Sequence, residues 1–345
     1  MSAHEKTQHN LKLCPFGQTG MNITRVGFGS WAVGGDWAVG WGAQDDVDSI
    51  TAIHHALAQG INWIDTAAIY GLGHSEEVVG KAVRGIASGE RPYIFTKCGL
   101  IGDPENPNAG PKQVGDPKSI RHEVEGSLRR LGVERIDLYQ MHWPAEDGTK
   151  LEDYWQTLLD LKTEGKIRAA GLSNHNIAQL SAAEALGHVD TLQPPFSAIK
   201  REAGNKEIAW CAEHETGVIV YSPMQAGLLT GAFSKERAAT LPKNDWRSRN
   251  AEFQGEKLER NLKVAALFGE IGARHGISAA TVAIAWTLAW PGVTGAIVGA
   301  RSPKQVDGWI AAAQFELSGA EIEDIAVLLA ATGAGYGAIK PAKRG

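Results

Sequence analysis

Short apolar runs alternate with longer amphipathic stretches along most of this sequence, and this alternation constrains the fold more than any other feature. The short runs are rich in Val and Ile, as buried parallel strands are, and the longer stretches carry apolar residues at helical spacing. We predict strands at residues 26–30, 62–67, 93–98, 136–142, 167–173, 190–193, 217–222 and 296–299. We predict helices near residues 46–59, 75–88, 118–131, 151–164, 176–186, 204–215, 279–289 and 303–313. Eight such units predict parallel strands with right-handed crossovers, closed into a (β/α)8 TIM barrel.

Three segments lie outside the eight units. Apolar residues at 11–15 and 22–26 flank a turn at 17–20, which predicts a β-hairpin that plugs the barrel. Residues 223–257 are polar and rich in turn formers, which predicts a long functional loop. A last helix is expected near 318–331, and its pattern leaves open whether it covers the barrel or meets another subunit.

The composition fits one compact domain and argues against nucleic acid as a partner. Of the 345 residues, 43% are hydrophobic and 21% are charged. We therefore interpret 1–345 as a single barrel domain with a polar N-terminal tail at 1–10 and a C-terminal extension at 315–345. The net charge of -5 and the scattered Lys and Arg residues provide no basic surface for a phosphate backbone.

The cysteines and the apolar runs bear on location. Cys14, Cys98 and Cys211 are far apart and have no spacing typical of a zinc site, so we expect no metal and a reducing compartment. Residues 1–10 lack the apolar stretch of a signal peptide, and no run of eighteen apolar residues follows. These patterns predict a cytoplasmic protein that acts on a small molecule. They leave the oligomeric state open.

Four ionisable side chains stand at or just beyond the ends of three successive predicted strands: Asp65, Tyr70, Lys97 and His142. The carboxyl ends of barrel strands form the active-site face, so we expect these side chains to converge there. Each residue alone has an ordinary structural explanation. Asp65 fits a turn, Lys97 a strand-end lysine that extends to solvent, His142 the core and Tyr70 the barrel rim.

Taken together, the four side chains suggest proton transfer to a carbonyl oxygen. A buried Lys97 ammonium needs an anion, and Asp65 on the neighbouring strand is the nearest candidate. We expect Lys97 to lower the pKa of the Tyr70 phenol, so that Tyr70 acts as the acid while His142 orients the substrate oxygen. The set contains no nucleophile, metal or electron sink, so a bound cofactor must supply hydride.

The motifs around these residues resemble those of the aldo-keto reductases. The signature block is similar to Asn62-Trp63-Ile64-Asp65-Thr66-Ala67-Ala68-Ile69-Tyr70-Gly71 and the residues Gly73-His74-Ser75-Glu76-Glu77 after it. Further motifs follow in the family's order: Thr96-Lys97, Met141-His142-Trp143-Pro144, Gly165-Lys166-Ile167-Arg168, Gly171-Leu172-Ser173-Asn174, Tyr221-Ser222-Pro223 and Gly227-Leu228-Leu229-Thr230-Gly231. The resemblance covers residues 11 to 315.

The resemblance implies a catalytic tetrad and a dinucleotide site. The tetrad corresponds to Asp65, Tyr70, Lys97 and His142. The implied cofactor-binding residues are Ser30, Trp31, Asp65, Ser173, Asn174, Gln193, Tyr221, Ser222, Pro223, Gly227, Leu228, Gly231, Gly299, Arg301, Ser302 and Gln305. Among them, Ser173, Asn174 and Gln193 would bond the nicotinamide carboxamide. Tyr221 would stack on the ring, and residues 222–231 would follow the pyrophosphate. Arg301 and Ser302 beside a helix start suit a 2′-phosphate, so NADPH is favoured over NADH.

Other positions shape the substrate pocket or depart from the family pattern. The expected substrate-binding residues are Trp31, Tyr70, His142 and Trp143, with Trp37 as a further pocket aromatic. Gly308 and Trp309 stand where relatives often carry a Glu-Asn pair that contacts adenine, and Phe196 replaces a common tyrosine. We expect Arg247 and Arg249 to lie in a solvated loop.

We weigh three functions and one alternative fold. The favoured one is NADPH-dependent reduction of an aldehyde, with sugar-derived aldehydes among the candidates, or of a ketone. A nucleotide-binding subunit of the potassium-channel β type shares the barrel, but no inactivation peptide is recognisable here. A Schiff-base enzyme using Lys97 would need an unpaired lysine, against which Asp65 argues. The segment 27–32 fits the dinucleotide fingerprint G-x-G-x-x-A, yet no helical pattern begins before about Asp45, which argues against a Rossmann fold.

Overall fold

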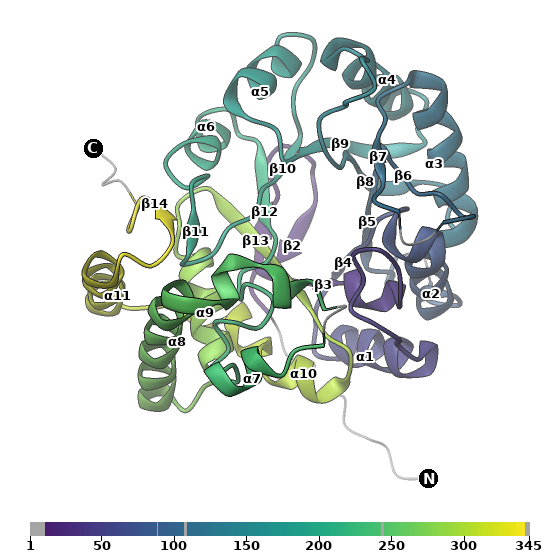
Figure 1. Ribbon diagram of the computed structural model, residues 1–345. Coiled ribbons are helices and arrows are strands. Elements are labelled where there is room, and N and C mark those ends of the chain that lie inside the picture. Colours follow the sequence, from purple (N-terminus) through teal and green to yellow (C-terminus); the bar gives the residue numbers. More distant parts are fainter. Residues whose placement is uncertain (1–10, 88, 107–108, 243–244, 342–345) are drawn as a thin grey trace.

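A computed structural model describes residues 11–87, 89–106, 109–242 and 245–341 as a closed barrel ringed by helices (Figure 1). The eight parallel strands follow one another around the barrel as β3 (Val26–Gly29), β4 (Trp63–Asp65), β5 (Tyr93–Cys98), β8 (Ile136–Met141), β9 (Ile167–Ser173), β10 (Thr191–Gln193), β12 (Gly217–Val220) and β13 (Val293–Gly299). Strand β13 pairs with β3 and closes the ring. The predicted fold class is confirmed, and the last strand begins three residues earlier than the sequence pattern indicated.

The predicted helices surround the barrel as α1 (Asp46–Ala58), α2 (His74–Val83), α3 (Pro117–Leu131), α4 (Leu151–Thr163), α5 (Ile177–Glu184), α6 (Glu207–Glu213), α9 (Ala279–Leu288) and α10 (Pro303–Asp307). Their starts follow local chemistry. The Asp45 carboxylate accepts the first free amides of α1, and Asp116 does the same for α3. Several predicted helices were too long, including 176–186 and 204–215, which are α5 and α6. Helix α2 ends at Val83, and the stretch 303–313 divides into α10 and a 3-10 turn, η5 (Ile310–Ala313). Residue 88, the predicted end of α2, lies outside the described residues.

The largest departure from the sequence prediction is α8 (Gly255–His275), a helix of 21 residues to which we assigned no element. Its signal was present, because Leu258, Val264, Phe268 and Ile271 are buried at helical spacing. The predicted loop 223–257 therefore ends at Gln254, and it contains α7 (Lys235–Ala239), η3 (Trp246–Arg249) and η4 (Ala251–Phe253). The connection from β12 to β13 carries both α8 and α9, so the repeat of one helix per strand misses α8.

The C-terminal extension packs on the outside of the ring. The predicted last helix is α11 (Gly319–Thr332), which packs against α8 (Figure 1). The Glu321 carboxylate bonds the His275 imidazole at the end of α8, with 2.6 Å between Oε1 and Nε2. Beyond α11, β14 (Tyr336–Gly337) pairs with β11 (Lys200–Arg201). Helix α11 thus covers α8, which answers part of the question that the sequence left open.

The predicted hairpin is present and fills one end of the barrel. Strands β1 (Leu13–Pro15) and β2 (Asn22–Thr24) are antiparallel, and the buried Phe16 and Met21 beside them pack among side chains from the strands. The rings of Phe16 and Phe95 stack with centroids 5.7 Å apart. A Cβ on Gly17 would lie 2.5 Å from the amide of Gly217, the first residue of β12. The hairpin therefore plugs the amino end of the barrel and leaves the carboxyl end open for a site.

The glycines of the segment 27–32 serve packing. A Cβ on Gly27 would lie 2.2 Å from the ring of Trp63, and one on Gly29 would lie 2.6 Å from Ile297. A four-residue 3-10 turn, η1 (Trp31–Gly34), follows Ser30, and the next α-helix begins only at Asp46. The segment therefore does not open the α-helix that a Rossmann fold requires.

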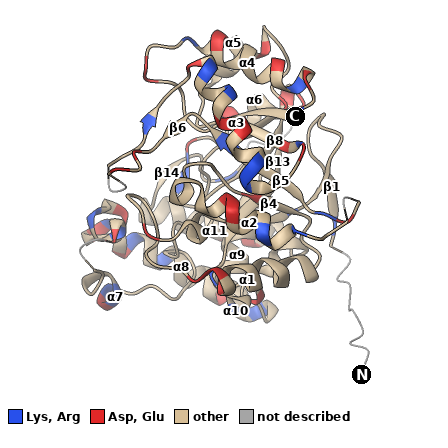
Figure 2. Ribbon diagram, turned by 90° about the vertical axis from the view of Figure 1, so that its right-hand side faces the viewer, with Lys and Arg blue, Asp and Glu red and all other residues tan. Residues whose placement is uncertain are grey.

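No helix in the described part of the chain is both long and apolar enough to cross a membrane. In the view of Figure 2, basic and acidic residues are interspersed over the helices, without a large surface of one sign.

Candidate active site

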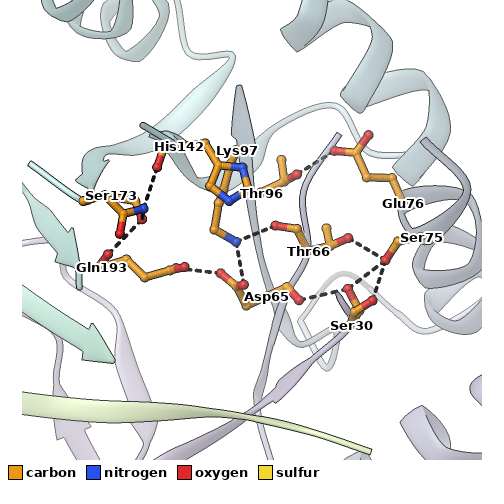
Figure 3. A network of polar contacts seen from close by, with 11 residues as sticks. Ser30, Asp65, Thr66, Ser75, Glu76, Thr96, Lys97, His142, Ser173 and Gln193 are labelled. Atoms are coloured by element: carbon orange, nitrogen blue, oxygen red, sulfur yellow. Dashed lines mark hydrogen bonds and ion pairs between the residues drawn. The ribbon is translucent and has the colours of Figure 1, made fainter. Parts of the chain in front are cut away.

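An ion pair lies at the carboxyl ends of β4 and β5 (Figure 3). The Lys97 Nζ donates to Asp65 Oδ1 at 2.6 Å and to the Thr66 carbonyl at 2.8 Å. The side chains of Lys97 and Asp65 are 0% and 3% exposed. Gln193 on β10 donates from Nε2 to the other Asp65 oxygen at 2.9 Å. The predicted pairing is thus present. Both carboxylate oxygens are satisfied, as a buried charge requires.

Tyr70 and His142 lie next to this pair. Tyr70 follows β4 in the short turn η2 (Tyr70–Gly73), and the Lys97 Nζ is 5.3 Å from the centroid of its ring. His142 follows β8, and its ring stands nearly perpendicular to that of Tyr70 at 76°, with centroids 5.8 Å apart. The structure therefore brings together the four side chains that the sequence singled out.

The expected effect of Lys97 on Tyr70 is wrong for this conformation. Burial raises the pKa of Tyr70 well above its usual 10, and Asp65 and Tyr221 raise it further. Burial is the largest cause, and the negative charge of Asp65, which lies against Lys97, adds to it. Tyr70 therefore carries its proton at neutral pH.

His142 is neutral in this site. Burial lowers its pKa well below 6.5, and the positive charge of Lys97 lowers it further. A neutral imidazole has one N–H donor and one acceptor, so His142 can hydrogen-bond a substrate oxygen without adding a charge.

A second layer of polar groups supports the ion pair from α2 (Figure 3). Glu76 is fully buried, accepts from Thr96 Oγ1 at 2.6 Å and from Arg130 Nε at 2.7 Å, and lies beside the strand that carries Lys97. In the sequence, Glu76 stood out only as part of the motif Gly73-His74-Ser75-Glu76-Glu77. Its spacing after Asp65 gave no sign that it would be buried.

Ser30 also belongs to this supporting layer. Its hydroxyl is buried, donates to the Asp65 carbonyl at 2.9 Å and is bonded by the hydroxyl of Ser75. The Ser30 hydroxyl is therefore bonded within the protein, and the role of Ser30 at a cofactor stays a prediction. The predicted strand 26–30 included Ser30, whereas β3 ends at Gly29.

The residues expected at the nicotinamide form one connected group at the ends of β9, β10 and β12. Ser173 Oγ donates to the Gln193 carbonyl at 2.8 Å, and Asn174 Nδ2 donates to the His142 carbonyl at 2.9 Å. The Tyr221 hydroxyl donates to Asn174 Oδ1 at 2.8 Å. Asn174 is held at φ 63°, a left-handed conformation that is uncommon outside glycine. This group lies against His142 and the Asp65 carboxylate.

The segment after β12 has an unusual backbone. Ser222, Gln225 and Ala226 have φ values of 57°, 47° and 52°, and Gly227 and Gly231 are also left-handed. Such conformations are costly for side-chain-bearing residues and concentrate at ligand sites. Leu228 is fully buried in the core, so only its backbone can face a ligand. Pro223 is buried beside it at the start of the segment.

Arg301, between β13 and α10, reaches across to the loop after β3. Its Nε donates to Gln44 Oε1, its Nη2 to the Ala43 carbonyl and its Nη1 to the Trp41 carbonyl. Its own amide donates to Gln305 Oε1 at 2.7 Å. Two other predicted residues flank this turn: Gly299 ends β13, and the Ser302 hydroxyl makes no capping bond to α10.

Aromatic side chains join two loops above the barrel. Trp41 packs edge-on against Trp31 at 5.3 Å and against Trp246 at 6.0 Å between ring centroids. The Arg247 guanidinium lies 5.1 Å from the Trp41 ring and bonds Asp245 at 2.6 Å. Arg247 is half-buried, so its assignment to a solvated loop was wrong, whereas Arg249 is exposed.

Other predicted pocket residues are divided between the interior and the surface. Trp37 is 7% exposed and its ring centroid is 6.3 Å from that of Tyr70, so it backs the phenol. Trp143 is 40% exposed beside His142 and is free to meet a ligand. Trp309 is 3% exposed, so it packs in the core at the position where relatives contact adenine.

Comparison with known proteins identifies the family. A model described as the aldo/keto reductase family matches residues 25–330. The chain belongs to the aldo/keto reductase family. It is 33% identical to the aldo-keto reductase YhdN of Bacillus subtilis over 312 residues, covering 90% of this chain and 91% of the relative. It is 32% identical to the NADH-specific methylglyoxal reductase of Escherichia coli over 323 residues, covering 90% and 96%.

A solved structure agrees with this assignment. The glycerol dehydrogenase of Gluconobacter oxydans superposes with a TM-score of 0.84 at 35% identity, covering 96% of this chain and 99% of that one. Membership in the aldo/keto reductases makes the chain an oxidoreductase of carbonyl groups with a nicotinamide cofactor.

Three residues of this aldo/keto reductase that contact predicted site residues could not be identified from the sequence. Trp41, Trp246 and Gln44 stand in loops without periodicity, and their partners are more than 200 positions away in the sequence. The abundance of tryptophan in the first loop was the one sequence feature that pointed to these contacts. Among the described residues, no three His, Cys, Asp or Glu side chains converge as metal ligands do.

Proposed function

We propose that this aldo/keto reductase reduces an aldehyde or a ketone to the alcohol with NADPH, and that Tyr70 donates the proton. The observation that carries the proposal is the buried Lys97–Asp65 pair beside the rings of Tyr70 and His142 at the open end of the barrel. When bound, the cofactor supplies the hydride that this set of residues lacks. We further propose that a single domain binds the cofactor and carries out the reduction. We also propose that the protein works in a reducing cytoplasm, since its three cysteines are unpaired.

The residues of the site divide the work between proton transfer and orientation. Tyr70 carries its proton at neutral pH and passes it from the phenol to the oxygen that becomes the alcohol, where Tyr70 is left as phenolate. Lys97, held by Asp65, lies close enough to stabilise that negative charge. His142 donates a hydrogen bond to the same oxygen and fixes its position.

The cofactor would lie along the ends of β9 to β13. We propose that Ser173, Asn174 and Gln193 bind the carboxamide and that Tyr221 stacks on the ring, because these groups form one network beside His142. The backbone from Ser222 to Gly231, with Gly227, would receive the pyrophosphate. Arg301, Ser302 and Gln305 would receive the adenosine phosphate, because the Arg301 charge faces only neutral acceptors among the described residues.

The substrate would enter between the aromatic side chains of the first loop and the loop after β8. We propose Trp31, Trp143, Tyr70 and His142 as the residues that contact it. Aldehydes derived from sugars or other polyols suit such walls, because aromatic faces pack against the apolar faces of these molecules. The named relatives act on glycerol and methylglyoxal, which makes small oxygenated compounds the first candidates.

A substrate panel tests the proposal. NADPH oxidation is measured with glyceraldehyde, methylglyoxal, dihydroxyacetone, aldose sugars and simple ketones, with NADH in parallel because one relative is NADH-specific. We expect turnover with NADPH and at least one aldehyde. Absence of turnover with every carbonyl and both nucleotides would overturn the proposed activity, and turnover with NADH alone would overturn the proposed cofactor.

The role of Tyr70 is tested by Tyr70→Phe. Since only the phenolic hydroxyl, the proposed proton donor, is removed, we expect kcat to fall by about 10²- to 10⁴-fold while the Kd for NADPH changes by less than about twofold. Tyr93→Phe is the matched control, because Tyr93 starts β5 at the opposite end of the barrel. Unchanged turnover in Tyr70→Phe would show that another group is the acid.

A further inference from the structure

The contact between Arg301 and the loop after β3 bears on which nicotinamide nucleotide this site prefers. We define the Arg301 latch as the three hydrogen bonds from its guanidinium to the Trp41 carbonyl, the Ala43 carbonyl and Gln44 Oε1. Gln44 also donates from Nε2 to the Arg301 carbonyl at 3.3 Å, so the two residues bond each other in both directions. The latch joins two segments 257 positions apart in the sequence.

The latch occupies a charge that has no counter-ion. All three guanidinium nitrogens point to neutral oxygens, and Arg301 forms no ion pair with an acidic side chain of the described residues. A guanidinium bonds an anionic phosphate more strongly than it bonds neutral carbonyl and amide oxygens. The latch is therefore an arrangement that an anion at this position would displace.

The loop can release Arg301 without losing its other anchor. The Trp41 ring packs against Trp31 and Trp246, and Arg247 covers it at 5.1 Å. These contacts involve side chains, whereas the latch uses two backbone carbonyls and the Gln44 amide. Breaking the latch therefore frees residues 43–44, while the packing of Trp41 against Trp31 and Trp246 keeps the loop in place.

We propose that Gln44 sets the nucleotide preference of this reductase by competing with the 2′-phosphate of NADPH for Arg301. This proposal rests on the proposed function, which places the adenosine phosphate at Arg301. NADPH must displace the latch and gives up part of its binding free energy to do so. NADH carries no 2′-phosphate, so it leaves the latch closed and gives up none of its binding free energy. Gln44 therefore narrows the advantage of NADPH over NADH.

Adenosine fragments isolate the phosphate from the rest of the cofactor. Adenosine 2′,5′-bisphosphate and adenosine 5′-monophosphate are titrated by calorimetry into the full chain and into Gln44→Ala, Arg301→Ala and the double variant. We expect Gln44→Ala to bind the bisphosphate about 3- to 10-fold more tightly and the monophosphate within about twofold of wild type. Arg301→Ala is expected to weaken the bisphosphate at least about tenfold. In the Arg301→Ala background, the effect of Gln44→Ala disappears.

Gln156→Ala is the control, because Gln156 is an exposed glutamine on α4 whose amide donates to Asp160 nearby. It should leave both affinities unchanged. The proposal is overturned if Gln44→Ala leaves bisphosphate binding unchanged or weaker, or if it tightens binding equally without Arg301. If the wild type reduces carbonyls and Gln44→Ala does not selectively change bisphosphate binding, only the proposed role of the latch is overturned. If the wild type binds neither nucleotide, the proposed function fails together with the latch.

Discussion

At the scale of single residues, the pKa of a buried carboxyl group in this barrel depends on the groups that contact it. Asp65 has Lys97, and Glu76 has Arg130, so both are paired with a cation. Glu123 on α3 is also buried, but its carboxylate accepts from the Gly99 amide at 3.0 Å and from the Ser119 hydroxyl, and it forms no ion pair within the described part of the chain. Burial therefore raises its pKa to about 7, against the pull of these hydrogen bonds.

This raised pKa predicts a pH-dependent stability. Because the folded pKa of Glu123 lies above the unfolded value, its contribution is most favourable below about pH 4.5 and is lost as the pH rises to about 7. Glu123→Gln keeps an acceptor for Gly99 and removes the titration. We expect it to raise the free energy of unfolding by about 2 kcal/mol more at pH 8 than at pH 5.

Urea unfolding at the two pH values measures this difference. Glu125→Gln on the same helix is the control, since Glu125 is 44% exposed beside Lys166 and its loss should matter little. An equal change at both pH values for Glu123→Gln would show that this carboxyl is ionised in the folded protein throughout.

At the scale of elements, a short loop positions Tyr70, whereas Asp65 and Lys97 stand on strands β4 and β5. Gly71 and Leu72 follow Tyr70 with φ values of 60° and 54°, which turns the chain back after β4. The backbone of this turn touches the first loop, because a Cβ on Gly71 would lie 2.1 Å from the Gly34 carbonyl. The position of the phenol therefore depends on the contact of two glycine backbones.

Gly71→Ala should move Tyr70 without unfolding the barrel. The added methyl group must push the two loops apart, and a shift near 1 Å at a reacting group lowers kcat/KM by about 10- to 100-fold. Gly85→Ala separates the steric effect from the cost of the backbone angle, because Gly85 has φ 83° and nothing within 4 Å of a Cβ. Both variants are compared by carbonyl reduction and circular dichroism. Equal activity in the two would argue against the loop contact.

At the scale of the whole molecule, the two ends of the barrel have separate tasks. The amino end is closed by the hairpin, whose Phe16 and Met21 pack inside the strands, while the carboxyl end carries the polar site. The core of one end and the site of the other share strands β4 and β5, through Trp63 and Phe95 below and Asp65 and Lys97 above. Stability and function therefore separate along the barrel axis.

Phe16→Ala should test this separation. Removing a fully buried ring leaves a cavity in the barrel and is expected to cost about 3 to 5 kcal/mol of the free energy of unfolding. Leu13→Ala, in the same hairpin but 52% exposed, should cost less than about 0.5 kcal/mol. Turnover of both variants below their unfolding temperatures should stay close to wild type. A loss of kcat in Phe16→Ala under those conditions would show that the plug also shapes the site.

The sequence by itself determined the barrel and the four side chains that converge at its carboxyl end, because both follow from local order. Buried parallel strands need continuous apolar runs, and Asp65, Lys97 and His142 end three of them, so their convergence follows from the strand order alone. Tyr70 lies beside them because it stands on the short loop after β4, where Gly71 follows it. Even α8, which we missed, left its helical spacing of apolar residues in the sequence.

Only the tertiary structure decided the charge states and the partners across long distances. The Tyr70 pKa is raised because desolvation and the Asp65 charge outweigh the ammonium that the sequence placed nearby, and this balance depends on distances in space. The bond from Arg301 to Gln44 and the packing of Trp41 on Trp246 join loops with no periodic pattern. Hydrogen bonds and ring contacts act over a few ångströms, so residues far apart in the sequence become partners only once the barrel has closed.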